Sequence, residues 1–331
     1  MQFSLIICTY MRPKAILRLL ESVANQKLYP DEILVIDGST DFATQNIFDE
    51  KIFKNLTYFK VEETNRGLTK QRNFGITKVS ETIDIVCFLD DDTILKHGYF
   101  ENLINTYNVY PKALAVGGYI TNEVTWEKST KDKTIHNFEY DGWLRKESSR
   151  FILRKKLGLL DDTPPGYMPI FSNGRSVSFL PPSGKIYPVE QLMGGVSSFK
   201  KNVFEEQQFS TYFEGYGLYE DADFSLRLAK KGSLYVNTAA QLEHHHHPEG
   251  RPNKFKYGVM VIRNGWYVWR VKYPKPSLKA RFKWNAIAFL LTLIRFGNVI
   301  TTSERKSALT EALGRKYGWC SLLFNKPKLQ R

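Results

Sequence analysis

Three consecutive carboxylates, Asp90 to Asp92, come directly after a β-branched and aromatic run at residues 83–89. Neighbouring Asp side chains repel one another, and folding alone gives no reason to gather them at the end of a buried strand. A hard divalent cation with a bound phosphate is the usual compensation for such a cluster. A solvated acidic turn is the alternative interpretation, and polar residues elsewhere in the chain decide between the two.

Two further sets of side chains could act together with these carboxylates. Glu220, Asp221 and Asp223 stand at the start of a run with helical spacing, where a carboxylate could accept a proton. The helix dipole also favours acidic residues at such a position, which is the structural explanation. Four consecutive histidines follow at residues 244–247, and a tract of imidazoles favours metal binding.

The elements that must position these residues follow from the hydrophobic pattern. Strands are predicted at residues 3–8, 32–37, 56–61 and 83–89, and a helix between the first two has Pro13 in its first turn. Strands that alternate with helices indicate an α/β fold with a largely parallel central sheet. Ligands bind beyond the carboxyl ends of strands in such sheets, and Thr9, Asp37 and the three carboxylates all fall there.

The phosphate chemistry at this edge differs from that of two common nucleotide-binding classes. The turn after the first strand lacks Gly-x-Gly-x-x-Gly, and the chain has no Gly-x-x-x-x-Gly-Lys-Ser/Thr, which excludes dehydrogenase-type and P-loop sites. Carboxylates together with Arg66, Lys70 and Arg72 suit a nucleoside diphosphate, although Lys70 and Arg72 could equally be solvated helix residues.

Four stretches, taken together, resemble glycosyltransferase family two. They are Ile6-Ile7-Cys8-Thr9-Tyr10-Met11-Arg12-Pro13, Val35-Ile36-Asp37-Gly38-Ser39-Thr40-Asp41, Asn65-Arg66-Gly67 through Arg72-Asn73-Phe74-Gly75, and Phe88-Leu89-Asp90-Asp91-Asp92. The resemblance covers the first hundred residues, in order and at the family's spacing. It implies a GT-A fold, a Rossmann-like mixed and largely parallel sheet flanked by helices. It also implies inverting transfer of a sugar from a nucleotide-sugar donor that is UDP-, dTDP- or GDP-linked.

The resemblance assigns roles to residues of the donor side. Asp92 stands at the metal position of the family's Asp-x-Asp motif, with Mn²⁺ or Mg²⁺ as the cofactor that neutralises the leaving diphosphate. His244, or alternatively His246, completes the metal's ligands, since alternate residues of an extended strand share one face. The nucleotide pocket is expected to comprise Thr9, Tyr10, Arg12, Asp37, Asn65, Arg66, Gly67, Arg72, Asp90 and Asp91.

The acceptor side is assigned in the same way. Gly194 and Gly195 resemble the family's Gly-Gly acceptor segment, where a sugar can approach the backbone closely; a plain tight turn is the alternative. Asp221 is expected to be the general base, with Glu220 beside it and Asp223 as the alternative base. Arg227 could hold either of the two aspartates in place.

The charge is distributed unevenly along the chain. The net charge is +13, and residues 251–331 carry 18 Lys and Arg against Glu304 and Glu311, which leaves a balance of −3 for residues 1–250. We therefore expect a catalytic domain at 1–250. Residues 119–190 are punctuated by Pro and Gly without a clear period, so we expect a nucleotide-binding half at 1–118 and an acceptor half at 119–250. A basic, aromatic helical region is expected at 251–331.

The C-terminal region suggests a membrane surface as a partner. The uncharged run at residues 284–294 is shorter than the roughly 20 residues of a spanning helix, which favours a helix lying on an anionic membrane surface. A helix packed on the catalytic domain is the alternative. The N-terminus lacks the features of a signal peptide and the three cysteines lie far apart, so we expect a cytoplasmic protein on the inner face of the membrane.

These patterns together predict an enzyme. It is expected to be a metal-dependent, hexosyltransferase-type glycosyltransferase that moves a sugar to a glycan or lipid-linked acceptor in cell-surface polysaccharide synthesis. One alternative is a nucleic-acid-binding protein that uses the basic tail, but the tail has no recognisable nucleic-acid motif and we expect no nucleic acid partner. The other alternative is a nucleotidyltransferase, whose glycine-rich loop is replaced here by Thr9-Tyr10-Met11-Arg12.

Overall fold

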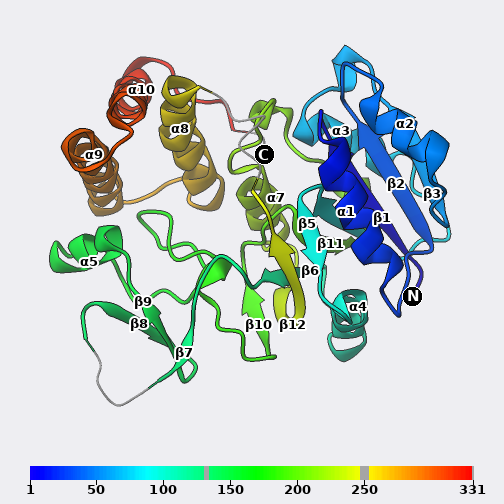
Figure 1. The fold of residues 1–331 in the computed structure, drawn as a ribbon. Coiled ribbons are helices and arrows are strands. Elements are labelled where there is room, and N and C mark those ends of the chain that lie inside the picture. The colour runs from blue at the N-terminus through cyan, green and yellow to red at the C-terminus, as the bar shows by residue number, and fades with distance from the viewer. Residues whose placement is uncertain (130–133, 247–252, 330–331) are drawn as a thin grey trace. The chain divides into compact units, whose positions relative to one another are not determined.

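The computed structural model describes residues 1–129, 134–246 and 253–329. The chain divides into two compact units, one formed by residues 1–125 and 180–250 and the other by residues 126–179 and 251–331 (Figure 1). Residues 126–179, which the sequence analysis placed in an acceptor half, thus belong with the C-terminal helices. As a division between donor and acceptor functions, the boundaries drawn from the sequence stay a prediction.

The first unit is built on a mixed, largely parallel sheet. Its parallel part runs in the order β3-β2-β1-β4, with bounds Leu56–Lys60, Glu32–Asp37, Phe3–Thr9 and Ile85–Asp90. Next to β4 lies β11 (Val196–Lys200), which is antiparallel to β4 and to β6 (Ala115–Ile120). The long β12 (Leu234–His244) pairs parallel with β6 and antiparallel with β10 (Ile186–Val189) and β5 (Thr93–Leu95).

Helices flank this sheet, and the predicted helix begins where the sequence indicated. Pro13 is the first residue of α1, a position where its missing N–H leaves no hydrogen bond unmade. The described helical elements of the unit are α1 (Pro13–Ala24), α2 (Ala43–Glu50), η1 (Glu63–Asn65), α3 (Leu68–Ile76), α4 (Tyr99–Val109), α6 (Val203–Glu206), η3 (Thr211–Phe213) and α7 (Glu220–Leu228).

The side chains of β4 alternate between the two faces of the sheet. Cys87 and Leu89 belong to the buried cluster that contains the apolar residues of α1 and α4. Phe88 lies on the other face, among Phe199, Phe204 and Phe209. β4 ends at Asp90, and Asp91 and Asp92 lie in the turn that leads to β5.

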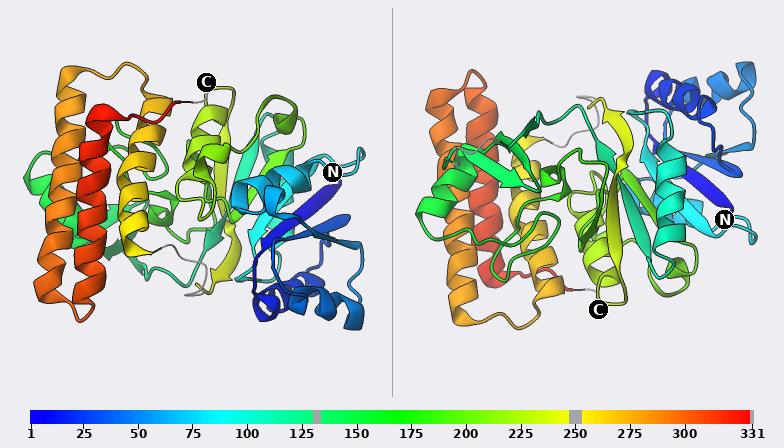
Figure 2. Two further views of the ribbon diagram at one scale, coloured as in Figure 1. Left: turned by 90° about the horizontal axis from the view of Figure 1, so that it is seen from above. Right: turned by 90° about the horizontal axis from the view of Figure 1, so that it is seen from below.

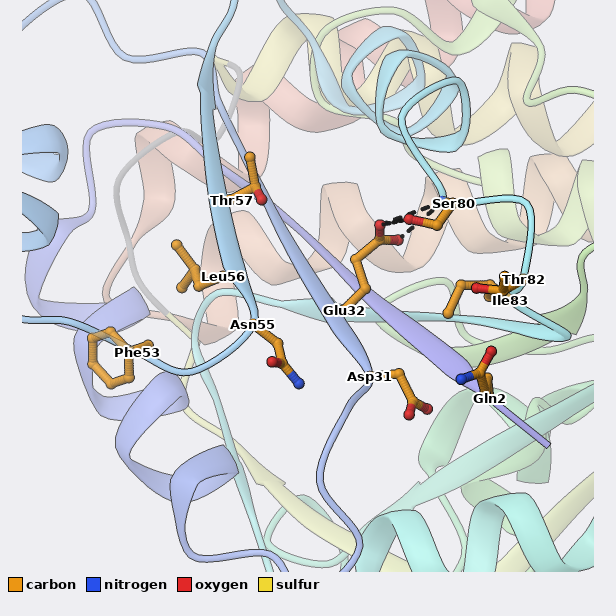
Figure 3. A pocket seen from close by; sticks show the side chains of 10 residues that line it. All are labelled: Gln2, Asp31, Glu32, Phe53, Asn55, Leu56, Thr57, Ser80, Thr82 and Ile83. Atoms are coloured by element: carbon orange, nitrogen blue, oxygen red, sulfur yellow. Dashed lines mark hydrogen bonds between the residues drawn. The ribbon is translucent and has the colours of Figure 1, made fainter.

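Acidic residues at the amino end of the sheet have structural partners. Asp31 accepts a hydrogen bond from the backbone N–H of Phe3 at 2.8 Å. Glu32 accepts hydrogen bonds from Ser80, and Figure 3 shows these two side chains turned toward each other in a pocket at this edge. These two carboxylates therefore have hydrogen-bond partners within the protein. The three consecutive carboxylates lie at the opposite, carboxyl edge of the sheet.

The second unit contains a small antiparallel sheet and the C-terminal helices. The sheet has the order β7-β9-β8, with bounds Glu127–Lys128, Trp143–Lys146 and Asn137–Tyr140, and is followed by α5 (Ser149–Lys156) and η2 (Val177–Phe179). The predicted C-terminal helical region is confirmed as α8 (Lys254–Lys272), α9 (Leu278–Thr301) and α10 (Arg305–Phe324). Figure 2 shows these three helices side by side.

Glycines and one buried carboxylate hold the three helices together. A methyl group on Gly314 would overlap the carbonyl oxygen of Phe255, and one on Gly258 would overlap that of Glu311. The Glu311 carboxylate is buried and pairs with Arg295 of α9 at 2.8 Å and with Arg315 at 2.7 Å. The contact between α8 and α10 therefore depends on backbone approach, and the contact between α9 and α10 includes an ion pair.

The expectation of a short apolar helix at residues 284–294 was wrong. Helix α9 has 24 residues, because one cation at Arg295 does not end an apolar stretch that Phe296, Val299 and Ile300 continue. Within the described residues it is the one helix long and apolar enough to cross a membrane, and 22% of its most apolar window is buried. Length and composition alone are weak evidence for such a span.

We predict that Gly314→Ala destabilises the protein whereas Gly297→Ala does not. Alanine at 314 would overlap Phe255, and overpacking of this kind costs about 1–3 kcal/mol. Gly297 lies in α9 with nothing near its Cβ position, so alanine there is expected to leave stability unchanged or raise it by up to about 1 kcal/mol. Urea unfolding of both variants measures the difference; equal stabilities would contradict the close packing of α8 and α10.

Candidate active site

The strand-end carboxylates are neutralised by the protein's own cations. Arg12, at the start of α1, places Nη1 2.9 Å from Asp91 Oδ1 and 3.3 Å from Asp92 Oδ2. The Thr9 hydroxyl donates to Asp91 Oδ2 at 2.7 Å. Burial raises the pKa of Asp91 to about 6, although Arg12 and Thr9 oppose that rise. Residues at the ends of β1 and β4 and the start of α1 thus meet at this edge.

A possible metal-binding group forms where β12 reaches the end of β4. His244 Nε2 lies 3.0 Å from Asp92 Oδ1, and Asp90, Asp92 and His244 each offer a ligand atom within 4.8 Å of the others. The pairing of His244 with Thr93 fixes this approach, and the N–H of His245 donates to the Asp92 carbonyl at 2.8 Å. Two carboxylates and one imidazole are a donor set that fits Mn²⁺ or Mg²⁺.

The state of His244 in the metal-free protein reflects its neighbours. Burial disfavours the imidazolium, but hydrogen bonds with Asp92 and Glu123 outweigh it and raise the pKa of His244 to about 10. A metal at Nε2 would displace that proton. The alternative ligand, His246, is more exposed and contacts Glu123 at 2.9 Å. His247 lies outside the described residues.

Arg72 connects the end of β4 with the start of α7. Its guanidinium is buried over the rings of Phe88 and Phe209, forms an ion pair with Glu220, and lies 3.5 Å from Asp90. Burial raises the pKa of Glu220, and the charge of Arg72 opposes that rise. The interpretation of Arg72 as a solvated helix residue is therefore wrong, because burial requires it to be paired.

Lys70 and the remaining cations of this segment behave differently. Lys70 contacts Glu214 at 3.4 Å and is partly exposed. The Arg66 guanidinium donates to the Gly38 carbonyl at 2.8 Å. Gly67 has a φ of 114°, which a residue with a side chain rarely adopts, and Asn65 ends the short helix η1.

Gly194 and Gly195 occupy a place where no side chain fits. A Cβ at Gly195 would overlap the Asp90 carboxylate, and one at Gly194 would lie 2.5 Å from Glu220 Oε1. The Gly194 N–H donates to Asp221 Oδ2 at 3.2 Å. A plain turn does not explain both glycines, because their neighbours are charged groups from three other elements.

The structure distinguishes the two aspartates proposed as bases. Asp223 is fully buried and pairs with Arg227 at 2.7 Å. Asp221 is partly buried and accepts hydrogen bonds from two backbone N–H groups, and within the described residues it has no ion pair. Burial raises the pKa of Asp221. Arg227 therefore pairs with Asp223 and not with Asp221. The Asp221 carboxylate lies beside the backbone of Gly194.

Asp37 and Tyr10, two of the predicted nucleotide residues, lie at the ends of β2 and β1. Asp37 ends β2 beside Thr9, where its two oxygens accept hydrogen bonds from the Ser39 N–H at 2.8 Å and the Tyr58 hydroxyl at 2.7 Å. Tyr10 is 43% exposed at the end of β1. Both residues lie at the carboxyl edge of the sheet, as the strand pattern predicts.

Sequence reasoning missed two residues at this edge. The buried Gln71 amide donates to the carbonyls of Thr9 and Ile36 at 3.0 and 2.8 Å, and so fixes the ends of β1 and β2. Its position between Lys70 and Arg72 could have drawn attention to it. Glu123 lies 3.3 Å from His244 Nδ1, and nothing in the sequence pattern around it indicates that contact.

Comparisons with known proteins show the family to which the chain belongs. The family described as Glycosyl transferase family 2 matches residues 4–172. Among curated proteins, the chain is 29% identical over 124 residues to a glucosyl-dolichyl phosphate glucuronosyltransferase of Haloferax volcanii, which covers 36% of this chain and 38% of that one. It is 28% identical over 95 residues to the O-antigen chain rhamnosyltransferase RfbN of Salmonella typhimurium, covering 29% of each. The matches therefore span less than two fifths of these relatives.

A solved structure supports the fold over nearly the whole chain. The mannosyltransferase PcManGT of Pyrobaculum calidifontis, in complex with GDP-Man and Mn²⁺, superposes with a TM-score of 0.54 and 14% identity. The match covers 98% of this chain and 88% of that protein. At this identity the likeness shows the fold alone, which is the GT-A arrangement that the sequence resemblance implies.

We predict that Mn²⁺ stabilises the protein through Asp92. A ligand at 100 times its Kd adds about 2.7 kcal/mol to the native state, so Mn²⁺ is expected to raise the Tm of the wild type. Asp92→Asn replaces a charged ligand with an uncharged side chain of similar shape and is expected to abolish that rise. Asp84→Asn is the control, because Asp84 precedes β4 at its other end and accepts a hydrogen bond from the Gln2 N–H. An undiminished rise in Asp92→Asn would show that Asp92 is no ligand.

Proposed function

Because the chain belongs to glycosyl transferase family 2, we propose that it is an inverting, metal-dependent glycosyltransferase. It transfers a hexose from a nucleoside-diphosphate sugar to a glycan or lipid-linked acceptor. The observation that carries this proposal is that Asp90, Asp92 and His244 lie at the same strand edge as Gly194, Gly195 and Asp221. One edge thus offers groups for a diphosphate and for an acceptor hydroxyl.

The charges at the strand edge support a donor site there. A divalent metal held by Asp92, His244 and Asp90 would neutralise the leaving diphosphate. Arg12 already stands against Asp91 and Asp92, where it can contact a phosphate oxygen. Asp37, Tyr10, Asn65, Arg66 and Gly67 would line the nucleoside end of the pocket. The GDP-Man and Mn²⁺ of the Pyrobaculum enzyme support a nucleotide-sugar donor and a divalent metal.

The hydrogen bonds of Asp221 support a role as the general base on the acceptor side. Inversion at the anomeric carbon needs one carboxylate that removes the proton of the attacking hydroxyl. Asp221 fits that role, because the backbone N–H groups of Gly194 and Ala222 hold its carboxylate without neutralising it. Glu220, paired with Arg72, would position the segment instead of accepting the proton.

The acceptor class rests on the relatives. The Haloferax relative is named for glucosyl-dolichyl phosphate and the Salmonella relative for the O-antigen chain. These names favour a lipid-linked or glycan acceptor in cell-surface polysaccharide synthesis over the nucleic-acid and nucleotidyl-transfer alternatives. That the protein has no nucleic acid partner stays a prediction.

We predict that Asp221→Asn separates binding from turnover. Nucleotide affinity is expected to stay near that of the wild type, while turnover falls by about 10²–10⁴-fold, the usual contribution of a positioned base. A thermal-shift screen of UDP, GDP, dTDP and CMP with and without Mn²⁺ first identifies the donor base. Release of that nucleoside diphosphate from its sugar then measures turnover.

Asp223→Asn is the matched variant for this test. It breaks the pair with Arg227 and is expected to lower stability more than turnover. Burial raises the pKa of Asp221, so its carboxylate is protonated at a higher pH than an ordinary aspartate. As the pH is lowered, turnover is therefore expected to fall before the pH reaches the usual range of aspartate. A large loss of turnover in folded Asp223→Asn, with Asp221→Asn unaffected, would identify Asp223 as the base.

The partner we propose for the second unit is an anionic membrane surface on the cytoplasmic side. Helix α9 exposes Phe282 by 74%, Phe289 by 48% and Leu293 by 48%, and their spacing of seven and four residues places them on one face. Its opposite face is buried through Trp284, Ile287 and Ala288, among others. An apolar face on a strongly basic region is typical of an interfacial helix. Phe289 also contacts the ring of Trp319, so the aromatic residue that the packed-helix alternative leaves unexplained is Phe282.

We predict that liposome binding depends on both charge and this apolar face. The wild type is expected to sediment with vesicles containing anionic lipid, less so at high salt, because salt screens about 1 kcal/mol per Lys or Arg. Changing Phe282, Phe289 and Leu293 to Gln is expected to remove the part of binding that salt spares. Ile52→Gln with Val109→Gln, at exposed positions of the first unit, is the control. A folded wild type that stays in solution with anionic vesicles at low salt would contradict the proposal.

A further inference from the structure

Two consecutive residues after β6 hold the proposed metal-binding histidine from its backbone and from its ring. The Asn122 side chain donates to the carbonyl of His244 at 3.0 Å and accepts from its N–H at 2.9 Å. This pair of hydrogen bonds continues the ladder between β6 and β12 beyond the end of β6. Asn122 thus fixes the backbone of His244, and the next residue contacts its ring.

The ring of His244 has a carboxylate at each nitrogen. Nε2 lies 3.0 Å from Asp92 Oδ1, and Nδ1 lies 3.3 Å from Glu123 Oε1. A neutral imidazole carries a proton on one nitrogen and a lone pair on the other, so the partner of one nitrogen decides what the other can do. An acceptor at Nδ1 keeps the proton there, so a metal that displaces the proton of Nε2 would find its lone pair directed toward Asp90 and Asp92.

Glu123 is itself held in place. The His246 ring approaches the same oxygen, with Nε2 2.9 Å from Glu123 Oε1, and the His244 and His246 rings lie 4.1 Å apart between their centroids. The histidine tract therefore contributes two rings to one carboxylate. His245, between them, turns to Glu243 at 3.2 Å and takes no part in this contact.

We propose that Glu123 is a positioning residue for the metal site. It accepts the Nδ1–H of His244, orients the ring and keeps Nε2 available as a ligand, with His246 holding the carboxylate. Metal-binding histidines commonly donate their second ring N–H to a carboxylate, and loss of that partner typically weakens metal binding 10- to 100-fold. The inference rests on the proposed metal role of Asp92 and His244 and adds two residues to it.

One competing arrangement uses the same three residues. Glu123, His244 and His246 also offer one ligand atom each within 4.8 Å of the others, so a second cation could bind between them. His244 would then bridge two ions through its two nitrogens. The stoichiometry of binding separates this arrangement from a positioning role, because positioning leaves one ion per chain.

The test is Mn²⁺ binding to the full chain, measured by titration calorimetry and by the electron paramagnetic resonance signal of free Mn²⁺, with the nucleoside diphosphate from the donor screen present. Glu123→Ala is expected to weaken binding about 10- to 100-fold at an unchanged stoichiometry of one. Glu123→Gln, which keeps an uncharged acceptor, is expected to fall between Glu123→Ala and the wild type. Glu243→Ala is the matched control and is expected to bind Mn²⁺ as the wild type does, because Glu243 contacts His245 instead of His244.

Three outcomes would overturn the inference. They are wild-type affinity in Glu123→Ala, equal losses in Glu123→Ala and Glu243→Ala, and a stoichiometry that falls from two to one, which would make Glu123 a ligand of a second ion. Urea unfolding of the metal-free variants is expected to show folded proteins, with Glu123→Ala less stable than the wild type because it loses its contacts with His244 and His246. Metal affinities are therefore compared under conditions in which every variant is folded. If Asp92→Asn binds Mn²⁺ normally, the proposed metal site fails instead, whatever the result for Glu123.

Discussion

The mutual repulsion of Asp90, Asp91 and Asp92 is the constraint on which the site depends. Two unit charges 4 Å apart interact by about 4 kcal/mol near a protein surface, so each carboxylate needs an opposite charge close by. Arg12, Arg72 and His244 supply these charges from α1, α3 and β12. Three elements that are distant in the sequence are thereby drawn to one strand end. The glycines at 194 and 195 follow from the same crowding, since Asp90 and Glu220 fill the space that their side chains would need.

Much of this edge was predictable because its signals are local. Each of the first strands is a short apolar run that closes on a polar residue, and parallel strands bring such ends together. That pattern predicted the places of Thr9, Asp37 and the three carboxylates, and the alternation of residues in a strand predicted that His244 and His246 share a face. The helix start at Pro13 is equally local, because it depends on one residue's missing N–H.

The rest depends on contacts that no local pattern encodes. Whether Arg72 is solvated or buried is decided by Phe88, Phe209 and Glu220, which come from other elements. The different surroundings of Asp221 and Asp223 come from Arg227, one helical turn after Asp223, and from the N–H of Gly194. The grouping of residues 126–179 with the C-terminal helices and the full length of α9 were missed for a similar reason. Composition along the chain does not show which distant segments pack together, so it could not group residues 126–179 with the helices. The apolar helix continues past Arg295 because that residue forms an ion pair with Glu311.

His244 reaches Asp92 because β12 pairs with β6 on one side and with β5 on the other. β12 is the last strand of the described chain, whereas β4 and its carboxylates come much earlier. Pairing between segments so far apart requires closing a long loop, which is entropically costly and slow. A cation bound between them would therefore stabilise the native sheet, because its ligands come together only when β12 and the end of β4 are both in place. The stability of the native sheet would then depend on the concentration of divalent metal.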